Sequence, residues 1–251
     1  MKILVFSPLN ISSVNNNEKH SYNGINWVKS FVNVLKEIKE IEIGVMFFST
    51  QHKSEFIESN IKYFPIYRAK LNPFRKLLKY HNLLNDPNKE SDILNIKESI
   101  SNFSPDIIYV FGIESELASL QLEEYFKKPI IYHLQGLIYP YYFAFYPPDF
   151  SDFSAIRFGN FIRELLFKNG LIGNKYRFLK KGKLELKLLN RISYVAGRTV
   201  WDKLYSTIVS PNIKYYHIDE VLRETFYLST DNHENSGELK FEKLLEDDKI
   251  D

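Results

Sequence analysis

Apolar residues occur in short runs that recur along the chain and are rich in β-branched and aromatic side chains. Each run is four to eight residues long, which is the length of a strand. Most runs lack polar alternation, and this indicates burial on both faces, as in a parallel sheet. The predicted strands are Ile3–Phe6, Ile41–Phe48, Lys62–Ile66, Asp106–Phe111, Pro129–Leu134, Ile192–Ala196 and Lys214–Ile218.

Segments with helical periodicity lie between most of these runs. In the first, Ile25, Val28, Val32, Leu35 and Ile38 mark one apolar face. Repetition of strand, helix and strand predicts an α/β fold with a doubly wound, mostly parallel sheet flanked by helices, whose ligands bind at the carboxyl ends of the strands. The other predicted helices cover about Ser91–Asn102, Glu114–Phe126, Phe158–Lys168, Tyr176–Asn190, Thr199–Ile208 and Asp219–Phe226.

Two regions interrupt this alternation. Residues 135–157 hold a run of Tyr, Phe and Pro directly after a strand, and we predict a long functional loop there. From Ser229 the chain is acidic and has few apolar anchors, so it is expected to be disordered or to form a short frayed helix at Leu239–Leu245. We therefore divide the chain into a domain at 1–228 and a tail at 229–251.

Composition narrows the classes of function. The 251 residues include no Cys, which excludes disulfides, thiolate zinc sites and Cys nucleophiles. A net charge of +2 gives no support for a nucleic-acid partner, and the six scattered His give none for a metal site. No cofactor is implied. The N-terminus has no signal-peptide pattern and no window reaches the roughly 18 apolar residues of a membrane span. We expect a cytoplasmic protein, and a position on the inner membrane surface stays open.

Polar residues follow one buried strand at its carboxyl end. His133 ends Pro129–Leu134 and is followed by Gln135 and, after a turn, Tyr139. A titratable side chain at this place points into the ligand crevice of such a sheet. The alternative is a structural histidine bonded to a carbonyl of a neighbouring loop.

Three further candidates lie at turns between strands and helices. Gly24 precedes the first helix, where backbone N–H groups can hold a phosphate, although the residues alone favour an ordinary helix-entry turn. Glu114 opens a helix, where a carboxylate interacts well with the helix dipole. Arg198 could hold a phosphate or carboxylate, or it could pair with Asp202 at i+4.

Two segments are basic and interleaved with Leu, Phe and Tyr: Arg68–Lys79 and Lys175–Lys187. Basic amphipathic segments can lie on anionic membranes. A solvated helix face is the alternative explanation.

Taken together, these elements resemble glycosyltransferase family 4. The resemblance rests on the opening strand ending in Ser7-Pro8, Gly24-Ile25 with its helix, the segments SPDIIYV (104–110) and PIIYHLQG (129–136), and the stretches 197–202 and 216–223. Members of this family have the GT-B architecture, in which two Rossmann-like domains face each other across a cleft. The resemblance implies that this chain is the N-terminal, acceptor-side domain of a retaining hexosyltransferase that acts in polysaccharide biosynthesis.

The resemblance also implies roles for individual residues. Gly24 would approach the donor diphosphate, and His133 would lie near the donor sugar and the acceptor. The aromatic segment with Tyr139 would shape the acceptor side, where a glycan or a lipid-linked acceptor binds. Arg198, Glu114 and Gln135 would be acceptor-side or phosphate contacts.

The sequence departs from the family in one respect, since we find no counterpart of the family's second domain. That domain grips the nucleotide and would need roughly another 150 residues. We expect the chain to need a donor-domain polypeptide as partner and to bind nucleotide sugars weakly alone. A non-catalytic subunit that binds a glycan or a lipid carrier is an alternative function. A third, an unrelated flavodoxin-like domain, fits the order of the motifs less well.

Overall fold

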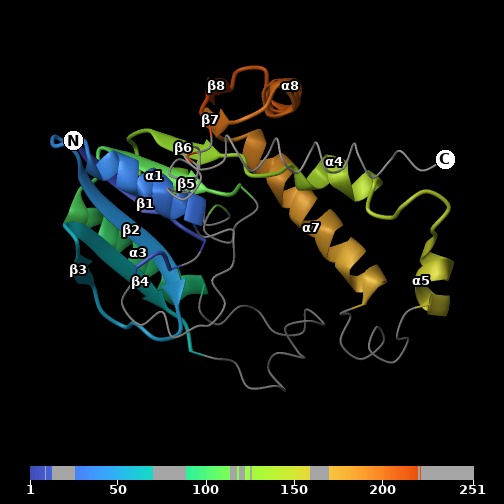
Figure 1. The fold of residues 1–251 in the computed structure, drawn as a ribbon, viewed down its shortest axis with the longest axis horizontal. Helices are drawn as coiled ribbons and strands as arrows, with labels where there is room; N and C mark the ends of the chain where they lie inside the picture. Colours follow the sequence, from blue (N-terminus) through green and yellow to red (C-terminus); the bar gives the residue numbers. More distant parts are fainter. Residues whose placement is uncertain are drawn as a thin grey trace, which may run out of the picture.

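The computed structural model describes residues 1–8, 10–12, 26–69, 89–113, 118, 122–124, 126–158, 170–219 and 221. Within these residues eight strands form one sheet, in the order β3-β4-β2-β1-β5-β6-β7-β8 (Figure 1). Every neighbouring pair is parallel except β3 and β4. The strands are β1 (Lys2–Phe6), β2 (Glu42–Ser49), β3 (Phe56–Glu58), β4 (Ile61–Tyr67), β5 (Ile107–Phe111), β6 (Ile130–His133), β7 (Tyr194–Gly197) and β8 (Lys214–His217).

All the predicted strands are confirmed, each with boundaries within two residues of those predicted. The pattern missed β3, which is three residues long and pairs antiparallel with β4. The two strands are joined at Ser59 and Asn60, whose φ angles of 51° and 65° are those of a tight hairpin turn. A Ser-Asn pair is a weaker hairpin signal than Asn-Gly, and three residues are too few to show a period.

The helices are α1 (Asn26–Lys36), α3 (Lys89–Phe103), α4 (Ile138–Phe143), α5 (Asp152–Phe158), α7 (Leu171–Leu189) and α8 (Val200–Val209), with a 3-10 turn, η2, at Leu122–Glu124. The predictions of α1, α3, α7 and α8 are confirmed. The loop predicted at 135–157 contains α4 and α5, so that prediction was wrong in part.

Several predicted elements cannot be compared in full. Most of Glu114–Phe126, nearly all of Phe158–Lys168, most of 219–226 and the whole of the acidic tail lie outside the described residues. In the first of these, the described Leu122–Glu124 form a 3-10 turn in place of an α-helix.

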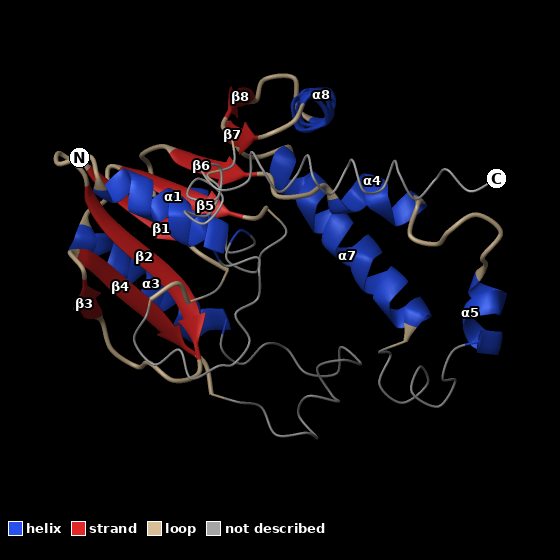
Figure 2. Cartoon of the chain, viewed as in Figure 1, coloured by secondary structure: helices blue, strands red, loops and turns tan. Residues whose placement is uncertain are grey.

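Helices cover both faces of the sheet (Figure 2). Alternate residues of each strand enter different cores, since side chains alternate along a strand. On one face Val28 and Val32 of α1 pack with Ile3 and Val5 of β1. On the other face Ile96, Ile100 and Phe103 of α3 and Leu189 of α7 pack with Leu4, Phe6 and Tyr132. The sheet is therefore buried on both sides, as its uninterrupted apolar strands predict.

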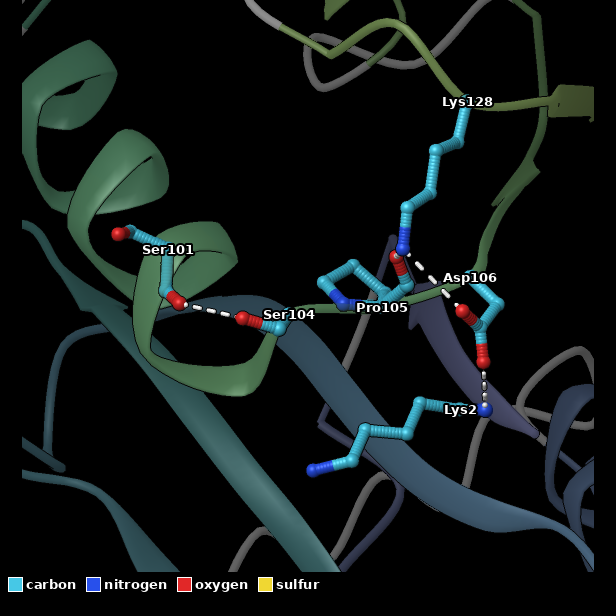
Figure 3. Close-up of polar contacts among 6 residues, drawn as sticks. All are labelled: Lys2, Ser101, Ser104, Pro105, Asp106 and Lys128. Atoms are coloured by element: carbon cyan, nitrogen blue, oxygen red, sulfur yellow. Dashed lines mark hydrogen bonds and ion pairs between the residues drawn. The ribbon is translucent and has the colours of Figure 1, made fainter.

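The segment Ser104-Pro105-Asp106 has a structural role at the amino ends of the strands (Figure 3). Ser104, with a φ of 52°, ends α3 and donates its hydroxyl to Ser101 O at 2.9 Å. Asp106 accepts from Lys2 N at 2.8 Å and from Lys128 Nζ at 3.1 Å, and Lys128 also donates to Pro105 O. The backbone N–H of Lys2 and the Lys128 ammonium lower the pKa of the exposed Asp106 carboxyl. This motif joins β1, β5 and β6 and is remote from the carboxyl edge.

Gly44 lies in the tightest part of the core. A Cβ there would meet Leu4 Cδ1 and Phe64 Cε2 at 2.9 Å and Phe103 Cε1 at 3.1 Å. We predict that Gly44→Ala lowers the free energy of unfolding by about 1–3 kcal/mol, because core side chains must leave their rotamers. Urea unfolding measures this. Gly136→Ala is the matched control, since nothing lies within 4 Å of its Cβ position; equal losses in both variants would contradict the packing argument.

Candidate functional site

The carboxyl ends of β5, β6 and β7 bring three chain segments together. Phe111 pairs with His133, and His133 pairs with Ala196. Backbone bonds continue past the strands, from Gly112 N to His133 O at 3.1 Å and from Leu134 N to Ala196 O at 2.8 Å. The turn that follows β7 therefore lies beside the turn that follows β6, which places two of the predicted candidates, His133 and Arg198, at one edge of the sheet.

His133 lies in an aromatic enclosure on the α1 face of the sheet. It is 4% exposed, and its ring centroid lies 5.3 Å from that of Phe111 and 5.7 Å from that of Trp27. Trp27 belongs to the first turn of α1, so this turn contributes one wall of the enclosure. The Nδ1 atom is 2.7 Å from the hydroxyl oxygen of Tyr109, and Nε2 has no hydrogen-bond partner among the described residues.

These surroundings keep His133 neutral at physiological pH. Burial and, next to it, the Arg198 charge lower the pKa of His133 to about 4, while the Asp202 carboxylate acts in the opposite direction. Burial also raises the pKa of the Tyr109 hydroxyl, which stays protonated. Sequence reasoning left open a histidine bonded to a loop carbonyl; its partner in the structure is instead a side chain on the neighbouring strand.

Arg198 connects the two turns. Its guanidinium Nη2 donates to the backbone O of Gln135 at 3.0 Å. The sequence predicted a pair of the Arg198 and Asp202 side chains; the contact found is to the backbone instead, because Asp202 Oδ2 accepts from Arg198 N and Thr199 N, each at 3.0 Å. Asp202 N in turn bonds Thr199 Oγ1 at 3.0 Å, which completes a capping box at the start of α8. The amide nitrogen of Gln135 is buried and has no partner within the part of the chain that the structure describes.

The aromatic segment after β6 is held by a buried acid of α7. Glu185 is 0% exposed, and its carboxylate accepts from Ile138 N at 2.7 Å and Tyr139 N at 3.2 Å, the first N–H groups of α4. Gly182, one turn before, allows close approach, because a Cβ there would stand 2.8 Å from Tyr139 Cα. These two residues fix where the predicted acceptor segment leaves the sheet.

Beyond this anchor the aromatic segment is exposed. Tyr141 and Phe143 of α4 are 54% and 72% exposed, and Phe153 of α5 is 71% exposed. In Figure 1, α4, α5 and the amino end of α7 extend away from the sheet. The segment thus combines a fixed start with a solvent-exposed apolar surface.

Gly24 and Glu114, the other two predicted site residues, lie outside the described residues. Sequence reasoning missed Tyr109, Trp27 and Glu185. Glu185 had a detectable signal, since it is an acid in a basic helix that falls on the buried stripe with Gly182 and Leu189. In the described ranges there is no group of three or more His, Cys, Asp or Glu side chains that could hold a metal ion.

Solved structures resemble this chain, whereas no protein-family model and no curated protein sequence matches it. Sucrose-phosphate synthase from Thermosynechococcus elongatus superimposes with a TM-score of 0.52 and 10% identity, over 87% of this chain and 47% of the synthase chain. A shorter chain of that synthase gives a TM-score of 0.50 and 10% identity, over 92% of this chain and 96% of the shorter synthase chain. UGT71G1 from Medicago truncatula, complexed with UDP-glucose, gives a TM-score of 0.46 and 12% identity, over 88% of this chain and 52% of the UGT71G1 chain.

This chain therefore spans about half the length of the longer synthase chain. At such identities the likeness concerns the fold. The mostly parallel eight-stranded sheet with its flanking helices is that of one Rossmann-like half of a GT-B structure.

The depressed pKa of His133 predicts a pH dependence of stability. The unfolded chain binds this proton near the ordinary value of 6.5, and the folded chain binds it only near 4. The stability that His133 contributes is therefore complete above pH 6.5 and is lost as the pH falls towards 4, by up to roughly 3 kcal/mol. We expect this loss in urea unfolding from pH 8 to pH 4.5 and expect it to be smaller in His133→Gln. His217→Gln controls for removal of an exposed imidazole; parallel curves for the wild type and His133→Gln would contradict a neutral buried ring.

Proposed function

We propose that this chain is the acceptor-side domain of a glycosyltransferase that resembles family 4 and transfers a hexose from a nucleotide sugar with retention. The observation that carries the proposal is the carboxyl edge of the sheet, where a buried imidazole with one unpartnered nitrogen lies beside Arg198 and the first turn of α1. The GT-B-like fold supports it. Ligands bind at this edge in open α/β sheets.

The residues divide into donor and acceptor contacts. His133 and Gln135 present buried polar nitrogens, and the Arg198 side chain brings a positive charge that suits phosphate. Gly24, just before α1, is proposed to approach the diphosphate through its backbone. We place the acceptor glycan or lipid-linked acceptor along the aromatic segment that begins at Tyr139, since aromatic faces pack well against sugar rings and acyl chains. Glu114 is also proposed as a ligand contact. The alternative explanation for this carboxylate is its interaction with the dipole of the helix that it opens.

The nucleotide-binding half is proposed to come from a second domain, either on the same polypeptide or on a separate one. The charge that retaining transfer places on the departing diphosphate needs preorganised donors or cations. Arg198 and one helix N-terminus supply a part of these. UDP, GDP and ADP sugars are the candidate donors.

One observation points to a partner surface, which the transferase proposal and the alternative of a non-catalytic partner subunit share. Helix α8 buries the polar Asp202 and Ser206 and turns four of its large apolar residues to solvent, while Tyr205 and Val209 pack against the core. Val200, Trp201, Leu204 and Ile208 are 73%, 49%, 52% and 77% exposed. We propose that another polypeptide covers this face. In the transferase proposal this polypeptide belongs to the same enzyme, and in the alternative it belongs to a separate one.

Membrane attachment is proposed for α7. Lys180, Lys183 and Lys187 are exposed on this helix beside Tyr176 and Leu184, which are 65% and 48% exposed. Arg68 of the other basic segment is instead paired with the buried Asp92, at 2.6 Å, and the remainder of that segment lies outside the described residues. None of the described helices is long and apolar enough to cross a membrane.

We predict that the purified chain alone binds UDP-, GDP- and ADP-sugars more weakly than about 1 mM and transfers no sugar. The reason is that most phosphate contacts lie in the second domain. Calorimetry and a transfer assay test this. Tight binding with transfer by this chain alone would contradict it and identify a complete, small enzyme.

Supplied with its donor domain, the enzyme is expected to lose about 10²–10³-fold in turnover on His133→Ala, the usual effect of removing one preorganised polar group. The thermal unfolding midpoint of the variant tells whether the loss of turnover comes from the missing side chain or from unfolding. His217→Ala is the control at an exposed imidazole. Activity that falls only in proportion to the folded fraction would favour a purely structural His133.

Vesicle flotation tests the membrane surface. We expect binding to anionic vesicles that weakens as salt rises, with on the order of 1 kcal/mol from each lysine near the surface. Lys180→Gln, Lys183→Gln and Lys187→Gln together should abolish it. The same change at Lys29, Lys36 and Lys39, which are exposed on or just after α1, is the matched control. Equal recovery on neutral and anionic vesicles would exclude this surface.

A further inference from the structure

The hydrogen bond between Tyr109 and His133 determines what His133 can offer to a ligand. The two side chains lie on adjacent parallel strands and on the same face, because Phe111 pairs with His133 and Tyr109 lies two residues earlier. Their contact of 2.7 Å is buried. A neutral imidazole carries one N–H and one lone pair, so the direction of this bond decides which of them faces the crevice.

Two arrangements are compatible with the contact. If Tyr109 donates its O–H to Nδ1, the ring carries its proton on Nε2, and a single group, Nε2–H, is left without a protein partner among the described residues. If Nδ1–H donates to the Tyr109 oxygen, the tyrosine hydrogen and the Nε2 lone pair are both buried without a partner there. Burying one unmet polar group costs less than burying two. The first arrangement is therefore favoured.

The groups around the ring favour its neutral form. Arg198 and Asp202 are the groups whose charges act on His133, and the positive one disfavours an imidazolium. Trp27 from α1 and Phe111 from β5 cover the ring with apolar surface. These surroundings keep the imidazole uncharged, and the hydrogen bond with Tyr109 decides which ring nitrogen carries the proton.

We infer that Tyr109 is a positioning residue: it fixes the neutral His133 as the tautomer protonated on Nε2, so that this nitrogen donates a hydrogen bond to an oxygen atom of the ligand and does not act as a base. The oxygen belongs to a phosphate or to a sugar hydroxyl. The role towards a ligand rests on the proposed function, whereas the tautomer is a property of the chain itself.

The tautomer is measured by correlating the ring nitrogens and carbon-bound protons of His133 in the ¹⁵N-labelled full chain at pH 7. We expect the pattern of an Nε2-protonated ring. In Tyr109→Phe the preference for this tautomer should fall about fivefold, the usual worth of one hydrogen bond. Tyr63→Phe is the matched control, since Tyr63 is a buried tyrosine of the same core that stacks on Phe56. An Nδ1-protonated ring in the wild type would overturn the inference, and this result does not require the Phe variant to fold.

The ligand atom is tested on the same resonances in the presence of a supplied donor domain, by adding UDP and then UDP-glucose. A shift of Nε2–H with UDP alone identifies a phosphate oxygen as the acceptor, and a shift that needs UDP-glucose identifies a sugar hydroxyl. An Nε2-protonated ring that neither compound shifts would overturn the ligand half of the inference, and calorimetry on the same sample would tell whether nucleotide binding itself, and with it the proposed function, has failed.

In the enzyme with its donor domain, His133→Gln should retain turnover within about tenfold, because the amide also donates from a similar place. His133→Leu should lose about 10²–10³-fold. The wild-type kcat should be flat from pH 8 to pH 5.5, as no base titrates there. Equal losses in both variants, or a kcat that falls with an apparent pKa near 6.5, would contradict donation and indicate a base.

Discussion

The parallel register of β5, β6 and β7 is the constraint on which the site depends. Both faces of the sheet are buried, so a polar side chain within a strand is stable only when it has a partner or lies at the strand end. His133 meets both conditions, as the last residue of β6 and as the diagonal neighbour of Tyr109. A shift of β6 by one residue would turn the imidazole to the α3 face and break this contact.

Helix α4, the second element of the site, is stabilised by contacts with α7. Helix α4 is too short to be stable by its own hydrogen bonds. It is held by the buried Glu185 carboxylate, which accepts its first N–H groups, and by the contact with Gly182. The same helix, α7, therefore presents its lysines to solvent and its one buried acid to the aromatic segment.

Most of the fold could be predicted from the sequence because its strands are uninterrupted apolar runs. The period of α1 and the Ser104-Pro105 stop after α3 place the helices equally well. By contrast, α4 arises from a contact with Glu185, forty-seven residues from Ile138, and no local pattern contains that information. Likewise His133 could be placed at the carboxyl edge, but its partner could not, since Tyr109 reads as one more apolar residue of β5. Asp202 was identified as a neighbour of Arg198, although the bond runs from the backbone N–H of Arg198.

The central claim is that the carboxyl edge around His133 binds the nucleotide sugar. Mapping of backbone amide shifts in the full chain on titration with UDP-glucose, in the presence of a supplied donor domain, tests it most directly. The account predicts that the largest shifts cluster at Gly112, Leu134, Gln135 and Arg198. Shifts that cluster instead at the amino ends of the strands, around Lys2, Asp106 and Lys128, would contradict it.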